Sequence, residues 1–418
     1  MSEFTFPQAL LEHAKRAEDK ICPQFTAIDE TASQNTAKIL EAFHDSRVSD
    51  ACFGETTGYG YNDLGREKLE QVYAQVFGAE AALVRLNFVN GTHTIASAMY
   101  ACVGSGDVFL SATGGVYDTL QTVTGQKGKL GGTFADYGIG YREVPLQDGA
   151  PDLAAIRQAA ADPAVKAVFI QRSRGYSTRS TLSSRQIGEI CQLVKQVNPA
   201  AVTVVDNCYG EFVDLTEPTQ HGADLVAGSL IKNPGGGLAP TGGYIVGRAD
   251  LVERAACRLT VPGIGSECGA TLGVNRSMFQ GLFMAPHTVA QALKTAVFSA
   301  ALLEELGFAV SPTSTEARHD IIQTIQFGRP EPLLAFCRGI QAGAPVDSFA
   351  VPEPWDMPGY DCPVVMAAGA FIQGASIDHT VFDAFQLYDT AFLQGGLTYE
   401  AGKLGVMVGA KRILEQQG

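Results

Sequence analysis

The sequence predicts an α/β protein with a mostly parallel, seven-stranded sheet, followed by a smaller C-terminal α/β domain. Short apolar runs, several of them rich in valine and isoleucine and bounded by turn residues, recur between residues 81 and 246, as buried strands do. Helical segments separate many of these runs, and such alternation places helices on both faces of a parallel sheet. The expected strands are Ala81–Leu86, Val108–Ser111, Arg142–Leu146, Ala167–Gln171, Val202–Val205, Leu225–Leu230 and Gly243–Val246.

Helical spacing of apolar residues marks the segments that flank and connect these strands. The first fifty residues predict two helices, Phe6–Lys20 and Thr31–Asp45, and a long helix, Pro286–Leu306, leads into the smaller domain. Other helices are expected at Arg66–Phe77, Thr92–Val103, Asp152–Ala161, Ser184–Asn198 and near Tyr399–Gln416. We therefore expect an N-terminal helical segment (1–50), a large domain (51–285) and a small C-terminal domain (286–418).

Composition excludes several classes of protein. The 418 residues carry a formal charge of −14, which disfavours binding to nucleic acid or to an anionic membrane. The N-terminus is polar and lacks a secretory signal, and no apolar stretch is long enough to span a bilayer. The nine cysteines are dispersed without a C-x-x-C pair, so we expect reduced thiols, no metal site and a cytoplasmic location.

Glycine is unusually frequent and unevenly spread. Of 46 glycines, ten lie in residues 104–140 and seven in residues 228–247. Glycine lets backbone turn tightly and approach a ligand, so these stretches predict two permissive loops around one site. The motifs G-x-G-x-x-G, Walker A and G-x-S-x-G are absent, which disfavours dehydrogenases, P-loop enzymes and α/β-hydrolases.

Two charged residues leave expected strands at the carboxyl edge of the sheet, where ligands bind in such folds. Lys232 ends the run Ser229-Leu-Ile-Lys232, and burial there would lower its pKa and favour Schiff-base chemistry. Asp206 ends the run Val204-Val205-Asp206, and a protonated pyridine nitrogen would be a suitable partner for its carboxylate. A surface lysine, and an aspartate that caps a turn or binds a metal, are the simpler alternatives.

Further along the edge, small and aromatic residues follow two other strands. Gly91 and Thr92 open an expected helix, where backbone N–H groups can bind a phosphate, and Ser229 can add a hydroxyl. Tyr117 follows the strand near Val108 and can stack on a planar ring. An ordinary helix cap and a core tyrosine are the alternatives.

Three arginines, Arg172, Arg174 and Arg179, follow the strand Ala167–Gln171. A guanidinium can bind a substrate carboxylate through two hydrogen bonds, and Arg174 is our first choice for that role. A solvated arginine, or one that orients a cofactor, is the alternative for each.

This succession of features along residues 50–415 resembles the pyridoxal-phosphate enzymes of the aspartate-aminotransferase fold, or fold type I. Within that fold the chain is most similar to the methionine γ-lyase-like family of the cysteine and methionine metabolism group, whose members are often labelled aluminium-resistance proteins. The stretches that carry the resemblance are 55–66, 171–179, 205–212 and 228–237.

The resemblance implies pyridoxal 5′-phosphate as cofactor and a role for each residue of the edge. Lys232 would form the Schiff base, Asp206 would pair with the ring nitrogen, and Tyr117 would stack on the ring. The phosphate would be held by Gly91, Thr92 and Ser229.

The resemblance also implies a homodimer or homotetramer with shared active sites. In related lyases a tyrosine and an arginine from a neighbouring subunit contact the phosphate. Tyr59 or Tyr61 fits the tyrosine, but the arginine expected two residues later is missing.

The implied reaction is β- or γ-elimination from a sulfur-containing amino acid, which gives a keto acid, ammonia and a thiol. Fold does not fix function, so an aminotransferase or another pyridoxal-phosphate enzyme is the first alternative. A non-catalytic α/β protein is the second.

Overall fold

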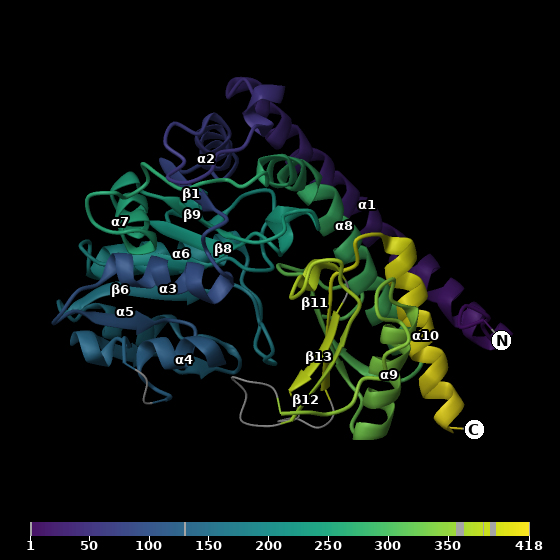
Figure 1. Ribbon diagram of the computed structural model, residues 1–418. Coiled ribbons are helices and arrows are strands. Elements are labelled where there is room, and N and C mark those ends of the chain that lie inside the picture. Colours follow the sequence, from purple (N-terminus) through teal and green to yellow (C-terminus); the bar gives the residue numbers. More distant parts are fainter. Residues whose placement is uncertain (1, 129–130, 357–362, 379, 385–389, 418) are drawn as a thin grey trace.

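Two domains, each built on its own sheet, are joined by two long helices (Figure 1). The computed structural model describes residues 2–128, 131–356, 363–378, 380–384 and 390–417. Helices α1 (Gln8–Asp45) and α8 (Asn275–Glu305) run side by side along both domains, and both chain ends lie at the small domain.

The large domain contains a seven-stranded sheet in the order β1-β9-β8-β7-β6-β2-β3. Strands β3, β2, β6, β7 and β8 are parallel to one another, and β9 joins β8 and β1 in antiparallel pairs. All seven expected strands are present, which confirms the predicted fold class. Their bounds are β1 (Ala81–Arg85), β2 (Val108–Ser111), β3 (Gly140–Glu143), β6 (Val165–Gln171), β7 (Val202–Asp206), β8 (Leu225–Ser229) and β9 (Gly243–Gly247). A short hairpin, β4 (Leu146–Gln147) and β5 (Ala150–Pro151), lies outside this sheet.

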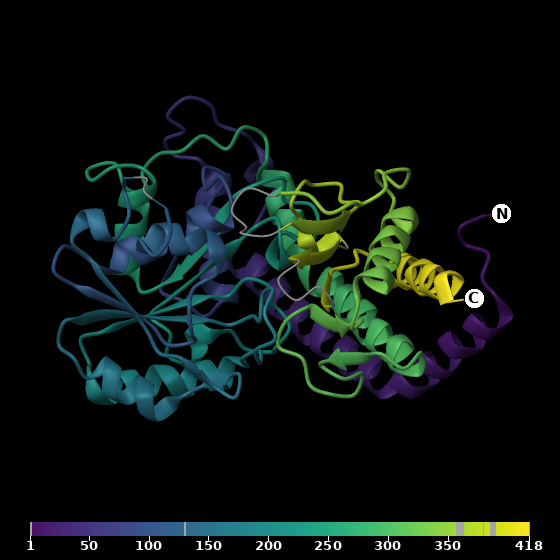
Figure 2. The same cartoon turned by 90° about the horizontal axis from the view of Figure 1, so that it is seen from below.

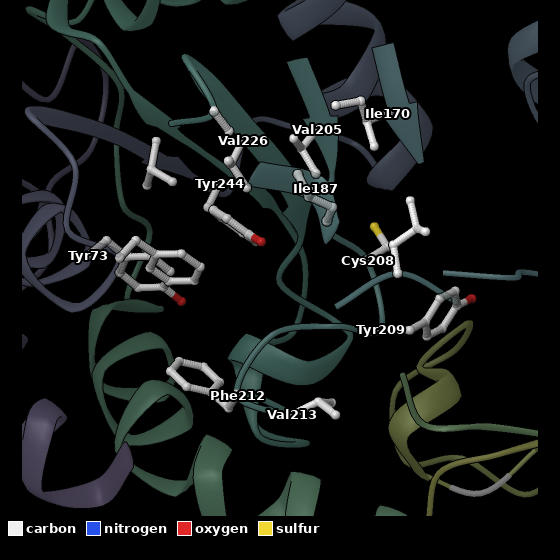
Figure 3. Packing of buried hydrophobic residues seen from close by; sticks show 14 of the residues in the cluster. Tyr73, Ile170, Ile187, Val205, Cys208, Tyr209, Phe212, Val213, Val226 and Tyr244 are labelled. Atoms are coloured by element: carbon white, nitrogen blue, oxygen red, sulfur yellow. The ribbon is translucent and has the colours of Figure 1, made fainter. Parts of the chain in front are cut away.

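Helices cover both faces of the large sheet (Figure 2). One apolar cluster joins the sheet to α3 (Gly91–Cys102), α4 (Asp118–Thr124) and α7 (Ala249–Leu259). A second cluster joins the other face to α8 and to α2 (Leu64–Val76), α5 (Leu153–Ala160) and α6 (Ser184–Val197). Figure 3 shows part of this second cluster, in which Tyr73, Tyr244 and Phe212 pack below the strands.

The small domain is an antiparallel sheet covered by two helices. Its strand order is β10-β11-β14-β13-β12, and α9 and α10 pack against each other beside it. The bounds are β10 (Ala309–Ser311), β11 (Ile322–Gln326), α9 (Pro330–Gly343), β12 (Val364–Ala368), β13 (Thr380–Ala384), β14 (Thr390–Gln394) and α10 (Tyr399–Gln417). In the part of the chain that the structure covers, no helix combines the length and apolarity that crossing a bilayer requires.

Both long helices extend further than the sequence predicts. The two expected N-terminal helices are one helix, α1, with Pro23 inside it, and α8 begins at Asn275 with Pro286 inside it. Apolar residues of each helix reach both domain cores, so packing along the whole length outweighs the hydrogen bond that each proline removes. Residue 285, where we expected the domain boundary, therefore lies within a helix that serves both domains.

Part of the glycine excess is explained by close packing against α8. The 3-10 turn η4 (Asn233–Gly235) follows Lys232, and it lies directly on this helix. A Cβ atom added to Gly281 would lie 2.3 Å from the carbonyl oxygen of Gly235. The glycines of this loop thus bring the backbone next to Lys232 close to α8.

We expect Gly281→Ala to destabilise the protein by about 1–3 kcal/mol, because the new methyl group overlaps rigid backbone. Thermal unfolding measures the change. The control is Gly104→Ala, whose added Cβ would meet only Asp107 Oδ2, at an ordinary 3.7 Å. Equal unfolding temperatures for the two variants would contradict the packing explanation.

Candidate active site

The carboxyl ends of β6, β7 and β8 open into a cavity of about 840 Å³. Gly114 and Gly115 line its wall, and Gln373 and Gly374 reach it from the small domain. Eight residues singled out from the sequence line it: Gly91, Thr92, Tyr117, Arg174, Arg179, Asp206, Ser229 and Lys232. Residues from five separate stretches of the chain therefore meet at one edge of the sheet.

Lys232 and Asp206 form the charged centre of the cavity. Asp206 is the last residue of β7, is 5% exposed, and accepts a hydrogen bond from the backbone N–H of Cys208 (3.1 Å). Burial raises the pKa of Asp206, and the positive charge of Lys232 opposes that rise. The carboxylate is thus well placed to attract a cationic group.

The sequence predicts that burial lowers the pKa of Lys232, but in the structure this pKa is raised. Burial lowers the pKa, but the acidic groups around the amine, with the Asp206 carboxylate among them, outweigh that effect and raise it well above its usual value. The amine is therefore held as an ammonium ion in this arrangement. Losing that proton, as Schiff-base chemistry requires, depends on a change in its surroundings when a ligand binds.

An anion-binding cradle lies at the first turn of α3. Asn90 caps this helix and its Oδ1 accepts the N–H of His93 (2.9 Å), whereas the N–H groups of Gly91 and Thr92 precede the first intrahelical bond. The buried Ser229 Oγ has no hydrogen-bond partner within the described residues. An added Cβ on Gly91 would lie 3.2 Å from Ser229 Cβ, so the glycine keeps the cradle open. The cradle fits a phosphate.

Tyr117 is tied to this cradle. It precedes α4, and its hydroxyl donates to Thr92 Oγ1 (3.3 Å), which lies 3.0 Å from Thr119 Oγ1. Burial raises the pKa of Tyr117, so the phenol stays neutral. The ring therefore forms a fixed wall of the cavity, on which a planar group can stack.

Arg179 holds the loop after β6 in place. Its guanidinium donates to the carbonyl oxygens of Thr113 (3.0 Å), Gln171 (2.9 Å) and Ser173. Burial lowers the pKa of Arg179 to about 10, which still leaves it charged at neutral pH.

Arg174 connects the cavity to the small domain. Its Nη1 donates to the carbonyl oxygen of Ser311 (2.9 Å) and to Thr324 Oγ1 (3.0 Å). Its backbone N–H donates to Asp320 Oδ2 (3.2 Å). It lines the cavity although the residue is only 4% exposed.

Arg172 lies outside the cavity lining and is fully buried. Its guanidinium donates to Asn207 Oδ1 (2.7 Å), Asp214 Oδ2 (2.8 Å) and Glu217 Oε2 (3.3 Å). A Cβ on Gly210 would lie 2.3 Å from Arg172 Cδ, so the arginine packs directly on the turn after Asp206. These contacts place Arg172 as an anchor of that turn.

Tyr59 and Tyr61 lie away from the cavity of their own chain. They are 71% and 56% exposed, and their rings stack with centroids 5.7 Å apart. Their loop is tied to the segment before α8 through Arg66, which donates to the carbonyl oxygen of Gly269 (2.7 Å). Neither side chain lines the cavity of its own chain.

Tyr209 is a cavity residue that the sequence argument missed. Its ring centroid lies 3.9 Å from Lys232 Nζ. The signal available in the sequence was its position three residues after Asp206, within one of the stretches that carry the family resemblance.

The buried charges around Arg172 predict a pH-dependent contribution to stability. Burial opposes ionisation of Asp214, but His319 and Arg172 hold its pKa down to about 2, against ~3.9 in an unfolded chain. Because the folded-state pKa is the lower one, the stabilisation is complete above pH ~4 and is lost as the pH falls toward 2. Asp214→Asn should therefore lower the free energy of unfolding by about 2–3 kcal/mol at pH 7.

Urea unfolding of this variant and the parent at pH 7, 5, 4 and 3 measures the difference, which should shrink below pH 4. Asp19→Asn is the control, because Asp19 forms an exposed pair with Lys15 and should not change stability. A pH-independent deficit for Asp214→Asn would contradict the assignment.

Comparisons with known proteins agree with the geometry. The model of the methionine gamma-lyase family matches residues 10–414. The uncharacterized protein YnbB of Bacillus subtilis is 44% identical over 415 residues, covering 99% of this chain and 98% of that protein.

Solved structures agree as well. A "carbon-sulfur lyase involved in aluminum resistance" from Clostridium novyi NT is 45% identical with a TM-score of 0.94, covering 98% of this chain and 97% of its own. The pyridoxal-5′-phosphate-dependent protein YhfS of Escherichia coli is 18% identical with a TM-score of 0.61, covering 93% and 97%, and shares the fold. The resemblance read from the sequence is confirmed: this chain belongs to the methionine gamma-lyase family.

Proposed function

We propose that this chain is a pyridoxal-phosphate-dependent carbon–sulfur lyase. It would act on a sulfur-containing amino acid by β- or γ-elimination and release a keto acid, ammonia and a thiol. The observation that carries the proposal is the meeting of Lys232, Asp206 and the anion cradle in one cavity. Membership of the methionine gamma-lyase family supports the reaction class.

Each residue of the cavity has a role in this proposal. Gly91, Thr92 and Ser229 would hold the phosphate, and Tyr117 would stack on the ring. Lys232 Nζ would bind the aldehyde carbon of pyridoxal 5′-phosphate. Once the substrate amine has displaced it, the neutral Lys232 amine would accept the proton of the substrate α-carbon.

Asp206 would stabilise a proton on the ring nitrogen. When bound, the cofactor would withdraw electrons from the substrate α-carbon, which is the chemistry that side chains cannot supply. The raised pKa of Asp206 suits a carboxylate that waits for a cationic partner.

Arg174 would bind the substrate carboxylate. Within the described part of the chain, the side-chain hydrogen bonds of Arg174 all leave from Nη1, and the residue lines the cavity. Arg172 and Arg179 instead donate to protein acceptors from both Nη1 and Nη2. A guanidinium with spare donors is the one suited to a carboxylate.

The exposed Tyr59 and Tyr61 support assembly of the enzyme as a homodimer or homotetramer. In such an assembly each loop would complete the cradle of a neighbouring subunit. We place the enzyme in the cytoplasm, where the cofactor and amino-acid substrates are available.

The reaction is tested by product analysis without any keto-acid acceptor. The parent should release keto acid and ammonia in equal amounts from at least one sulfur-containing amino acid, with a matching amount of thiol. Lys232→Ala should lose at least about 1000-fold in turnover, because both covalent attachment and proton transfer are removed. Strict dependence on an added keto acid would instead favour an aminotransferase. Full turnover by Lys232→Ala would contradict the assignment of the lysine.

Arg174→Met should lower kcat/KM by roughly 10–100-fold, because a charge-assisted pair with the carboxylate is worth about 1.5–3 kcal/mol. Cofactor uptake, followed by absorbance, should remain. The control is Arg412→Met, since Arg412 pairs with Glu3 (2.6 Å) and does not line the cavity. Unchanged kcat/KM for Arg174→Met would remove Arg174 from the site.

A further inference from the structure

The ring of Tyr209 lies against the amine that the proposed function requires. Its centroid is 3.9 Å from Lys232 Nζ, well within the distance at which an aromatic face attracts a cation. Both residues line the cavity, and Tyr209 is 8% exposed. A buried ammonium needs compensating partners, and the ring face supplies one.

The backbone that carries this ring has an unfavourable conformation. Tyr209 has φ = 71°, in the left-handed region that residues other than glycine rarely adopt. Such residues persist only where the surroundings hold them, and they cluster at functional sites. Here the turn is held by Arg172 through Asn207, whose carbonyl oxygen in turn accepts the N–H of Gly210 (2.9 Å).

The far end of the ring is held by the small domain. The hydroxyl of Tyr209 lies 3.4 Å from Ser376 Oγ, in the turn η5 (Ser376–Asp378). Figure 3 shows Tyr209 at the rim of the apolar cluster, beside the yellow ribbon of the small domain. The ring is thus fixed from both domains with its face toward the lysine.

We propose that Tyr209 is a further active-site residue, and that its ring face holds the ammonium form of Lys232 in the cofactor-free protein and after the released amine has accepted the substrate α-proton. The inference rests on the proposed role of Lys232. It gives the released lysine a defined resting place at the cavity wall, so that the amine stays close to the substrate α-carbon.

Other titratable groups face Lys232 and set the size of the expected effect. These are Asp206 at the end of β7, Cys208 and Glu211 in the segment that follows it, and Tyr117 at the start of α4. Burial raises the pKa of Glu211 to about 8, so this group is largely a carboxylate at the pH 8–9 of the experiment, and it raises that of Cys208 well above its usual value, so the thiol stays neutral. Asp206 and Glu211 therefore remain as stabilising partners in every variant when the ring is weakened.

The experiment compares full-length, cofactor-free proteins with phenylalanine, or phenylalanine bearing one, two or three ring fluorines, at position 209. Fluorine weakens the ring's attraction for a cation with little change of shape. Acetic anhydride labels free amines, and mass spectrometry of the peptide containing Lys232 gives the rate at pH 8–9. Because only the neutral amine reacts, labelling should accelerate stepwise with fluorination, by about three- to tenfold in total.

Three comparisons keep the test decisive. Tyr209→Phe should label like the parent, as should Ser376→Ala, which removes the hydroxyl contact but leaves the ring. Tyr209→Leu, if it folds, should label at least as fast as the most fluorinated ring. Labelling rates that do not change with fluorination would overturn the inference. If rates stay flat while Lys232→Ala abolishes turnover, only this inference fails; if Lys232→Ala keeps turnover, the proposed function fails.

Discussion

The parallel pairing of β6, β7 and β8 is the interaction on which the position of every charged residue in the cavity depends. Gln171 pairs with Asp206, and Asp206 with Ala227, so the three strands end close together at the same edge. The residues that follow each strand therefore meet without any long-range adjustment of the loops. The lysine and aspartate of the cavity lie 26 positions apart in sequence, yet the sheet alone brings them to one place.

Gathering charge at a buried edge creates a cost that the rest of the structure must offset. Arg172 offsets part of this cost, because it pairs with the carboxylates of Asp214 and Glu217 and holds the turn after β7. The small domain offsets another part, because the carbonyl oxygen of Ser311 accepts a hydrogen bond from the buried Arg174. The two long helices keep these domains together, since each contributes apolar residues to both cores.

Much of the fold, and many of the cavity residues, could be predicted from the sequence because both depend on local pattern. Buried parallel strands are short apolar runs, and their ends mark the edge where Lys232 and Asp206 lie. The start of α8 could not be predicted, because a proline such as Pro286 usually ends a helix, and the packing of α8 with α1 and both domain cores that offsets its lost hydrogen bond is not local in sequence. The different surroundings of Arg172, Arg174 and Arg179 depend on partners distant in sequence, which spacing does not reveal. The same holds for the ring of Tyr209.

The central claim is that the sheet edge places Lys232 to bind an aldehyde cofactor covalently. The most direct measurement is borohydride reduction of the protein with pyridoxal 5′-phosphate, followed by mass spectrometry of its peptides. The account predicts a visible absorbance band that borohydride abolishes, and one phosphopyridoxyl group on the peptide that contains Lys232. A protein that stays colourless with added cofactor, or label spread over surface lysines with Lys232 unmodified, would contradict it.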